Sequence, residues 1–339
     1  MLLQKKGAKS NLALLIIGVM LVLLPFVNDS RSLMIMMTQI FIFGIFAMSY
    51  DILLGFTGIV SFGHAAFFGI GAYAVGVFMD GMGPSIGVLI LAFVVGAILA
   101  AILSYLVGIL SLRLKSHFYA MLTLAISGLL LVVGEKWRSV TKGGEGFTFQ
   151  IPEALMNRTT LYLVALGLMI VIYLLLKRIT ISPLGKVLQA IRENEQRTES
   201  LGYEIVHYKV IASVVAGVVA SMSGGLYVIT LRFINTSVLS VDITLNALLM
   251  TIIGGVGTLV GAILGSSIIE LAHHWLTELA KVHPIFERWI IFFGLLYIVV
   301  VMVFPLGIIG TIKLWYNKRI AKQQGKKVEQ AWQTPIPPK

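Results

Sequence analysis

The sequence predicts an all-α membrane protein with about eight to ten transmembrane helices, one of them broken by glycines. Two observations on composition carry this prediction: 58% of the 339 residues are hydrophobic, and only 12% are charged. That charged share is about half of what soluble domains carry. The third observation is a series of apolar stretches long enough to cross a bilayer as helices. The mean hydropathy of +0.95 agrees with this class.

The apolar stretches divide into clear spans and one ambiguous segment. The ambiguous segment, 245–271, is long enough to span a membrane, but Gly254, Gly255 and Gly257 interrupt it. No Pro/Gly/Ser-rich linker divides the chain, so we expect one membrane domain at 11–312 between cytoplasmic tails at 1–10 and 313–339. The clear candidate spans are residues 11–27, 33–54, 58–79, 86–112, 118–134, 161–176, 206–231 and 290–309.

The distribution of positive charge predicts the orientation of the chain. If segment 245–271 is re-entrant and returns to the side from which it came, lysines and arginines divide as 18 inside and 8 outside; if it is a full span, they divide as 13 and 13. The positive-inside rule favours the re-entrant arrangement, with both termini cytoplasmic. A kinked full span is the alternative. The positive-inside rule thus explains the net charge of +11. We therefore expect no nucleic-acid partner.

A polar loop at 177–209 is the candidate contact surface for a partner protein. Within it, residues 185–201 have the pattern of one short amphipathic helix, with Val187, Leu188, Ile191 and Leu201 toward one side. Membrane proteins that hold such a helix at the cytoplasmic surface usually present it to a partner. The charged residues expected to stay in water are Lys186, Arg192, Glu193, Glu195 and Arg197.

Small residues recur every fourth position in three segments. This spacing places them on one face of a helix, where backbones can approach closely. We therefore expect short, tightly crossed helices, with a transport path at their meeting point as the alternative. The three stripes are Ser61, Ala65 and Gly69; Ser213, Gly217, Ser221 and Gly225; and Gly257, Gly261 and Gly265.

Titratable residues are scarce within the predicted spans. Asp51 lies near a predicted cytoplasmic end, which favours an interfacial or helix-capping role, and His64 is expected to bond a neighbouring carbonyl, with gating as the alternative. Proton-driven carriers need such groups at mid-depth, so their scarcity argues against an ion-coupled carrier. Adjacent His273 and His274, beside Glu270, point in different directions on a helix, which disfavours a metal site.

Sequence motifs for catalysis are missing. The chain has no G-x-x-x-x-G-K-[ST] phosphate loop, no H-E-x-x-H and no G-x-S-x-G, and it has no cysteine. We therefore expect neither an enzyme nor a resident cofactor or metal. A membrane enzyme acting on lipid would need a catalytic constellation that the sequence does not provide.

Four stretches resemble, in order, the permeases for branched-chain amino acids of the ABC importer superfamily, and most closely their LivM type. The resemblance extends from about residue 35 to 310, which is nearly the whole predicted membrane region. The stretches are GFTGIVSFGHAAFFGIGAY at 55–73, LTLAISGLLLVV at 122–133, PLGKVLQAIRENEQRTESLGYEIVHYKVIA at 183–212 and LLMTIIGGVGTLVGAILGS at 248–266.

The resemblance implies a permease subunit of an ATP-driven importer for leucine, isoleucine and valine in a bacterial plasma (inner) membrane. It implies a second, LivH-like permease, an extracytoplasmic substrate-binding protein and two ABC ATPase subunits, which would use the ATP and magnesium. Membrane lipid surrounds such a chain. Urea or short-chain amides are the alternative substrates, and an ion-coupled carrier is the alternative class.

The resemblance also assigns residue roles. Arg192, Glu193 and Glu195 would meet charges on the ATPase surface, and Gly202 would let the chain turn sharply. The coupling loop, 183–203, carries over onto Gly185, Ala190, Arg192, Glu193, Glu195, Leu201 and Gly202. The translocation path is assigned to Ser61, Gly63, His64, Gly69, Gly254, Gly255 and Gly257.

Overall fold

The computed structural model describes residues 30–111 and 116–280 continuously, together with Gly18, residues 20–27 and short pieces between 294 and 315. Within these residues, seven helices are long and apolar enough to cross a membrane. The all-α membrane class is therefore confirmed. The predicted spans at 11–27 and 290–309 lie largely outside the described residues, as do both tails.

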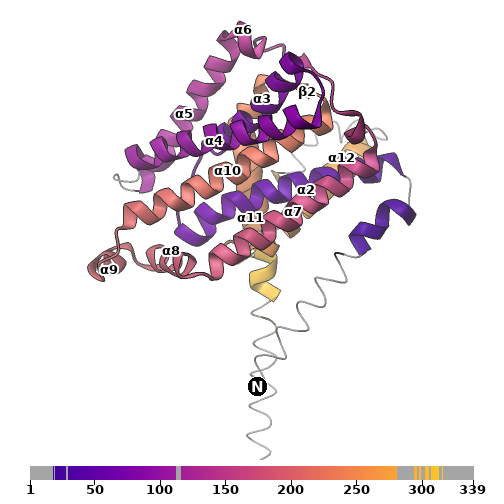
Figure 1. The fold of residues 1–339 in the computed structure, drawn as a ribbon. Coiled ribbons are helices and arrows are strands. Elements are labelled where there is room, and N and C mark those ends of the chain that lie inside the picture. Colours follow the sequence, from indigo (N-terminus) through magenta and orange to yellow (C-terminus); the bar gives the residue numbers. More distant parts are fainter. Residues whose placement is uncertain are drawn as a thin grey trace, which may run out of the picture.

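The described helices form one bundle in which long helices cross each other at an angle (Figure 1). The long helices are α2 (Arg31–Asp51), α3 (Ala65–Met82), α4 (Ile86–Ser111), α5 (Ser116–Lys136), α7 (Arg158–Ile181), α10 (Ile205–Leu231) and α12 (Leu259–Ala280). The short elements are the π-helix η1 (Ile52–Thr57), α6 (Arg138–Thr141), β1 (Phe147–Thr148), η2 (Glu153–Leu155), α8 (Pro183–Glu193), α9 (Glu195–Ser200), β2 (Phe233–Ile234), η3 (Thr236–Leu239) and α11 (Val241–Gly254).

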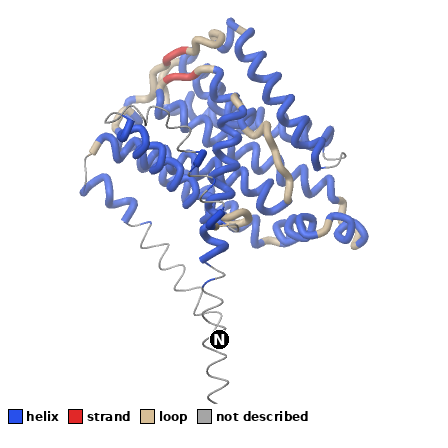
Figure 2. Tube along the Cα trace, turned by 180° about the vertical axis from the view of Figure 1, so that it is seen from behind, coloured by secondary structure: helices blue, strands red, loops and turns tan. Residues whose placement is uncertain are grey.

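The bundle has two distinct ends. Helices α8 and α9 lie at one end, which we call the α8 end, and the two short strands lie at the other, the strand end (Figures 1 and 2). The strands pair antiparallel, with Phe147 opposite Ile234. Lys142 stands between Asp80, at 2.6 Å, and the ring of Phe147. These contacts order the glycine-rich loop 141–147 at the strand end.

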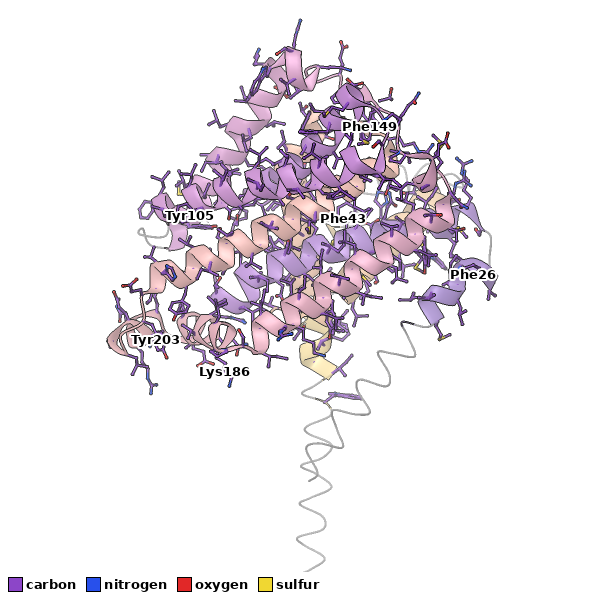
Figure 3. The ribbon with its side chains drawn as sticks, viewed as in Figure 1. Phe26, Phe43, Tyr105, Phe149, Lys186 and Tyr203 are labelled. Carbon is purple, nitrogen blue, oxygen red and sulfur yellow. The ribbon has the colours of Figure 1, made fainter. Side chains whose placement is uncertain are left out.

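Helix α10 packs against α3 and α4, and α2 lies among α7, α10 and α12. Phe43 of α2 sits inside this core against Phe68 and Tyr227 (Figure 3). The crossings are close because glycines remove side chains from them. A Cβ on Gly71 would overlap the carbonyl of Ser221. The expectation that small residues serve close helix packing is confirmed.

The predicted span 58–79 is wrong in its first part, because helix begins only at Ala65. Gly58, at φ +73°, ends the π-helix, and residues 58–64 then run without helical structure through the protein interior. Side chains replace the missing helical partners of the backbone. Phe62 N–H donates to Thr123 Oγ1 at 3.2 Å, and Ala65 N–H donates to Thr244 Oγ1 at 2.8 Å.

The glycine-broken segment 245–271 forms a hairpin of α11 and α12. Gly254 packs on Gly261, and Gly265 packs on Met250, which is the pairing of antiparallel helices. The break and the return of the chain are confirmed. The second arm, however, is no half-helix. Because its apolar residues continue past Leu271, α12 is long enough to cross a membrane, whereas α11 has only 14 residues.

We predict that Gly71→Ala destabilises the protein by about 1–3 kcal/mol, because the added methyl forces α3 away from α10. Gly167→Ala is the matched control: no atom lies within 4 Å of its added Cβ, so helix propensity alone should stabilise it by up to about 1 kcal/mol. Thermal unfolding in detergent, followed by tryptophan fluorescence, compares the two. Equal midpoints would contradict the packing account.

Candidate coupling site

Local sequence signals fix the corner between α7 and α8. Ser182 caps α8: its Oγ accepts a bond from Gly185 N–H at 3.5 Å, and Pro183 begins the helix. Leu188 and Ile191 are buried, while Lys186 points to solvent (Figure 3). The amphipathic prediction is therefore confirmed for α8.

Gly185 is a structural requirement of this corner. It is buried, and a Cβ on it would overlap the backbone of Thr180 at the end of α7. Ala190 is half-buried on the same helix. Gly185 thus lets α8 pack closely against the bundle.

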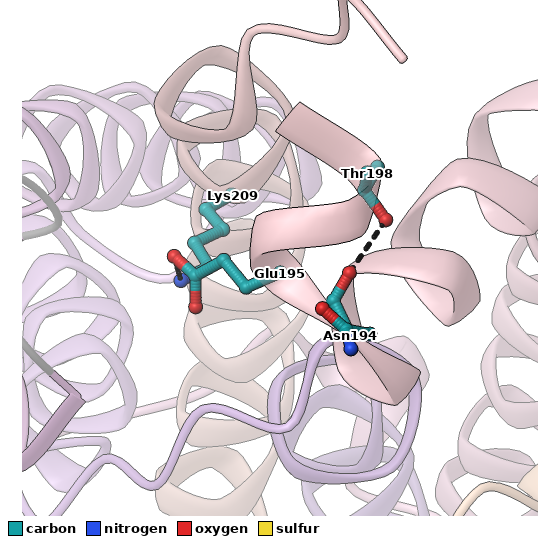
Figure 4. Close-up of polar contacts among 4 residues, drawn as sticks. All are labelled: Asn194, Glu195, Thr198 and Lys209. Atoms are coloured by element: carbon teal, nitrogen blue, oxygen red, sulfur yellow. Dashed lines mark hydrogen bonds and ion pairs between the residues drawn. The ribbon is translucent and has the colours of Figure 1, made fainter. Parts of the chain in front are cut away.

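The prediction of one helix through Leu201 is wrong. Asn194, at φ −159° and ψ 103°, is extended and ends α8. Its side chain accepts a bond from Arg197 N–H at 2.9 Å and thereby starts a second helix, α9. Thr198 Oγ1 closes the same turn on the Asn194 carbonyl at 2.9 Å (Figure 4). Leu201 therefore leaves the apolar face and is 71% exposed.

Gly202 behaves as predicted. Its φ of +90° is a conformation that side chains rarely adopt. It turns the chain from α9 toward the start of α10 at Ile205. Tyr203 in this turn is partly exposed at the α8 end (Figure 3).

Arg192 is exposed, as the sequence predicts, but its side chain also bonds the bundle. Its guanidinium Nη1 donates to the Gly55 carbonyl of η1. Its stem lies beside Gly58, where a Cβ would come within 3.2 Å of Arg192 Cγ. Gly257, between α11 and α12, also faces Nη1, which a Cβ there would approach to 2.9 Å. We call Gly55, Gly58 and Gly257 the glycine junction.

Asp51 holds the same junction from within the bundle. Its side chain is fully buried, and Oδ1 accepts a bond from Gly257 N–H at 2.7 Å. The helix-capping role predicted for Asp51 is wrong, because its side chain bonds the turn between α11 and α12 and not the end of a helix. Gly55 leaves room for this contact, since a Cβ there would overlap the carboxylate. Asp51 and Arg192, which have opposite charges, thus bind the glycine junction from two sides.

Glu195 also has a partner within the chain. Its Oε1 lies 2.7 Å from Nζ of Lys209 on α10 (Figure 4). The Lys209 side chain is only 7% exposed and that of Glu195 is 52% exposed, so the pair neutralises a nearly buried cation. Glu193, by contrast, is exposed and has no ion pair among the described residues.

The predicted path residues fall into two groups. Gly254, Gly255 and Gly257 lie at the hairpin turn, where Gly255 has φ +121°. Ser61, Gly63, His64 and Gly69 lie in and after the non-helical segment 58–64. Gly63 and Gly69 are packing positions, because a Cβ would overlap Thr123 or Leu239. The structure places the hairpin group beside Arg192 and the second group deeper in the core.

His64 bonds a side chain and not the carbonyl that we expected. Its Nε2 lies 2.8 Å from Ser49 Oγ, which donates its only proton to the Phe46 carbonyl at 2.6 Å. His64 Nε2 is therefore the donor in this assignment. The ring is fully buried, stacks on Phe46 and meets Tyr50 edge-on.

Three buried polar atoms in this region have no hydrogen-bond partner among the described residues: Tyr50 Oη, Ser61 Oγ and His64 Nδ1. Unpaired buried groups are rare and call for a specific reason. Over the same part of the chain, no group of three His, Cys, Asp or Glu side chains is arranged to hold a metal ion.

Several residues of the site had weak signals in the sequence. Asp51 stood out as a lone carboxylate at a span end, but its partner, Gly257, is more than two hundred positions away. Thr123 and Thr244 resemble ordinary polar residues of a span. In the sequence, Lys209 was only one of the positive charges that predict the orientation of the chain in the membrane.

The fold and this site define a multi-pass membrane protein whose surface helix is bonded to breaks in its transmembrane segments. Residues 32–301 match the family model described as "Branched-chain amino acid transport system / permease component". The chain belongs to this family of ABC transporter permeases. Both the resemblance seen in the sequence and the transport class are thereby confirmed.

Curated relatives carry the same assignment. The chain is 26% identical over 258 residues to the "Probable branched-chain amino acid transport permease protein LivM" of Methanocaldococcus jannaschii, covering 65% of this chain and 74% of the relative. It is 23% identical over 299 residues to the "High-affinity branched-chain amino acid transport system permease protein LivM" of Escherichia coli K12, covering 80% and 69%. No solved structure matches the chain.

We predict that Glu195→Gln destabilises the protein by about 1–2 kcal/mol, because Lys209 then stays nearly buried without its partner. The double variant Glu195→Gln with Lys209→Met should recover most of this loss, since no unpaired charge remains. A double-mutant cycle on thermal unfolding measures the coupling. Additive losses in the double variant would show that the pair is not coupled.

Proposed function

We propose that this chain is the LivM-type permease subunit of an ATP-driven importer for leucine, isoleucine and valine. The observation that carries the coupling role is the double attachment of α8: Leu188 and Ile191 bury its inner face, and Arg192 bonds the glycine junction. The names of the curated relatives support the substrate class.

The proposed orientation puts the α8 end and both termini in the cytoplasm. The charge distribution of the sequence supports it. Two ABC ATPase subunits would then dock on α8 and α9 and would bind the ATP and magnesium. A LivH-like permease would pair with this chain, and a substrate-binding protein would deliver the amino acid at the strand end. This chain itself would perform no catalysis.

In the proposed coupling mechanism, Arg192 has a different role from the other exposed residues of the loop. Glu193, Leu201 and Gly202 are exposed and would form the docking surface. Arg192 would transmit the displacement of α8 to η1 and to the hairpin, because its guanidinium is bonded to their junction. Closure of the ATPases would thus move α2, α11 and α12 as rigid bodies.

The segment 58–64 would act as the hinge next to the path. Its residues are not helical, and it joins η1 to α3. Ser61 and His64 within it carry unpaired polar atoms. We propose that these atoms gain partners, water or substrate, when α3 moves relative to α2.

The substrate assignment is tested with the complete transporter in proteoliposomes. ATP-dependent uptake of labelled leucine, with competition by isoleucine and valine, is the expected result. Uptake of urea or acetamide in place of leucine would move the assignment to the amide permeases. Leucine uptake that follows an ion gradient without ATP would contradict the importer.

We predict that Arg192→Ala separates ATP hydrolysis from transport. The complex should keep most of its ATPase activity and lose at least about tenfold in leucine uptake, because the link from α8 to the junction is removed. Arg197→Ala is the matched control, an exposed arginine on α9. Uptake at the control level in the Arg192 variant would contradict the coupling role.

A further inference from the structure

A cationic cavity lies at the strand end of the bundle. Its volume is about 260 Å3, and an adjoining cavity of about 440 Å3 shares its arginines. Arg31 begins α2, Arg158 begins α7 and Arg232 follows α10. These three helix ends meet on one side of the molecule, and Figure 1 shows α2 and α7 side by side there.

The three arginines are left without acidic partners in the described part of the chain. No aspartate or glutamate lines either cavity, and neither of the two described ion pairs involves them. The N-termini of α2 and α7 add partial positive charge, and the C-terminus of α10 adds partial negative charge. Three guanidinium groups gathered at one cavity repel each other, so an anion that binds among them is strongly favoured.

Arg232 adopts an unusual backbone conformation to take its place. Its φ of +57° and ψ of +23° are left-handed, which is uncommon for a residue with a side chain. Glycine is the usual residue at such a helix end. The guanidinium of Arg232 then reaches the Met156 carbonyl at 3.4 Å, beside Arg158. The backbone of Arg232 is therefore in an unfavourable conformation at the position where its guanidinium lines the cavity.

An apolar groove begins where the cationic cavity ends. Its volume is about 450 Å3, and it runs between α4, α7 and α10. Leu155 lines both spaces. On α7 the lining continues from Arg158 and Leu161 in the cavity to Val164 and Leu168 in the groove, a path of about 15 Å.

Helix α10 repeats this order of polar and apolar residues. Thr230 and Arg232 line the cavity, and Ile229 and Leu226 line the groove. Phe93 and Ile90 of α4 close the groove on its other side. The joined space therefore has a cationic end at the membrane surface and an apolar part that extends along the helices into the bilayer.

We propose that this joined space is a binding site for an anionic phospholipid. The phosphate binds among Arg31, Arg158 and Arg232, and one acyl chain lies in the groove beside Val164 and Leu226. Two features favour a lipid over a soluble anion or an acidic protein surface. The groove is lined by apolar side chains, and it opens on helices that cross the membrane. Anionic headgroups are attracted by basic clusters at the membrane surface.

The test uses native mass spectrometry of the purified full-length transporter after delipidation. Dioleoyl-phosphatidylglycerol is offered against dioleoyl-phosphatidylcholine, which has the same chains and no net charge. We expect phosphatidylglycerol to be retained about tenfold more strongly. The triple variant R31Q/R158Q/R232Q should lose this preference. Arg138→Gln, an exposed arginine on α6 and outside the cavity, should keep it.

The groove is tested separately. Val164→Trp should fill it and weaken retention of the lipid, whereas Val171→Trp, on α7 and outside the groove, should not. Glycerophosphoglycerol, the headgroup without chains, should fail to displace the lipid. If the triple variant does not fold, Arg158→Gln alone carries the test.

Three outcomes would overturn the proposal. The first is equal retention of the two lipids by the unmodified protein. The second is displacement of phosphatidylglycerol by glycerophosphoglycerol at equal concentration, which would define a site for free anions. The third is a triple variant that keeps the lipid preference but loses substrate uptake, which would assign the arginines to an acidic protein partner.

Discussion

The rest of this structure depends on how two breaks in transmembrane helices are held together by polar contacts. Each unpaired backbone group in a hydrocarbon environment costs several kcal/mol, so a broken helix is stable only where other groups replace the lost hydrogen bonds. Asp51 supplies such a group to Gly257, and Arg192 supplies one to Gly55. The glycines are required because the contact is so close that a single Cβ would overlap it.

This constraint explains why the surface helix α8 cannot move freely. Its inner face is apolar and buried, its first turn is packed against the end of α7, and its last turn is bonded to the junction. Only its outer face and α9 remain available to another protein. In the proposed mechanism, a displacement of α8 would reach α2 and the α11–α12 hairpin directly, without passing through the lipid-facing helices α4 and α5.

The sequence was sufficient to predict the class of protein, its family and the elements that have strong local signals. Apolar length located the spans, Ser182 and Pro183 located the start of α8, and the glycines at 254–257 located the break. It was not sufficient to predict the segments whose structure depends on contacts between residues far apart in the chain. The 58–64 segment resembles a helix in composition, but Thr123 and Thr244 satisfy its backbone differently.

Charges in particular could not be assigned from the sequence. Arg192, Glu193 and Glu195 look alike in an amphipathic pattern and all three are exposed. Even so, Arg192 bonds a carbonyl, Glu195 pairs with Lys209, and Glu193 has no ion pair among the described residues. The sequence likewise could not predict that the arginines at the strand end share one cavity, because they come from three helix ends far apart in the chain.

The central claim is that α8 and the hairpin move as one body. The chain has no cysteine, so spin labels can be placed on Gln189→Cys of α8 and Leu264→Cys of α12, both exposed positions. Electron–electron resonance then measures the distance between the labels in the full transporter, without nucleotide and with trapped ATP. The account predicts one narrow distance distribution in both states, which broadens when Arg192→Ala is added. A distance that changes between the two states with Arg192 in place would contradict it.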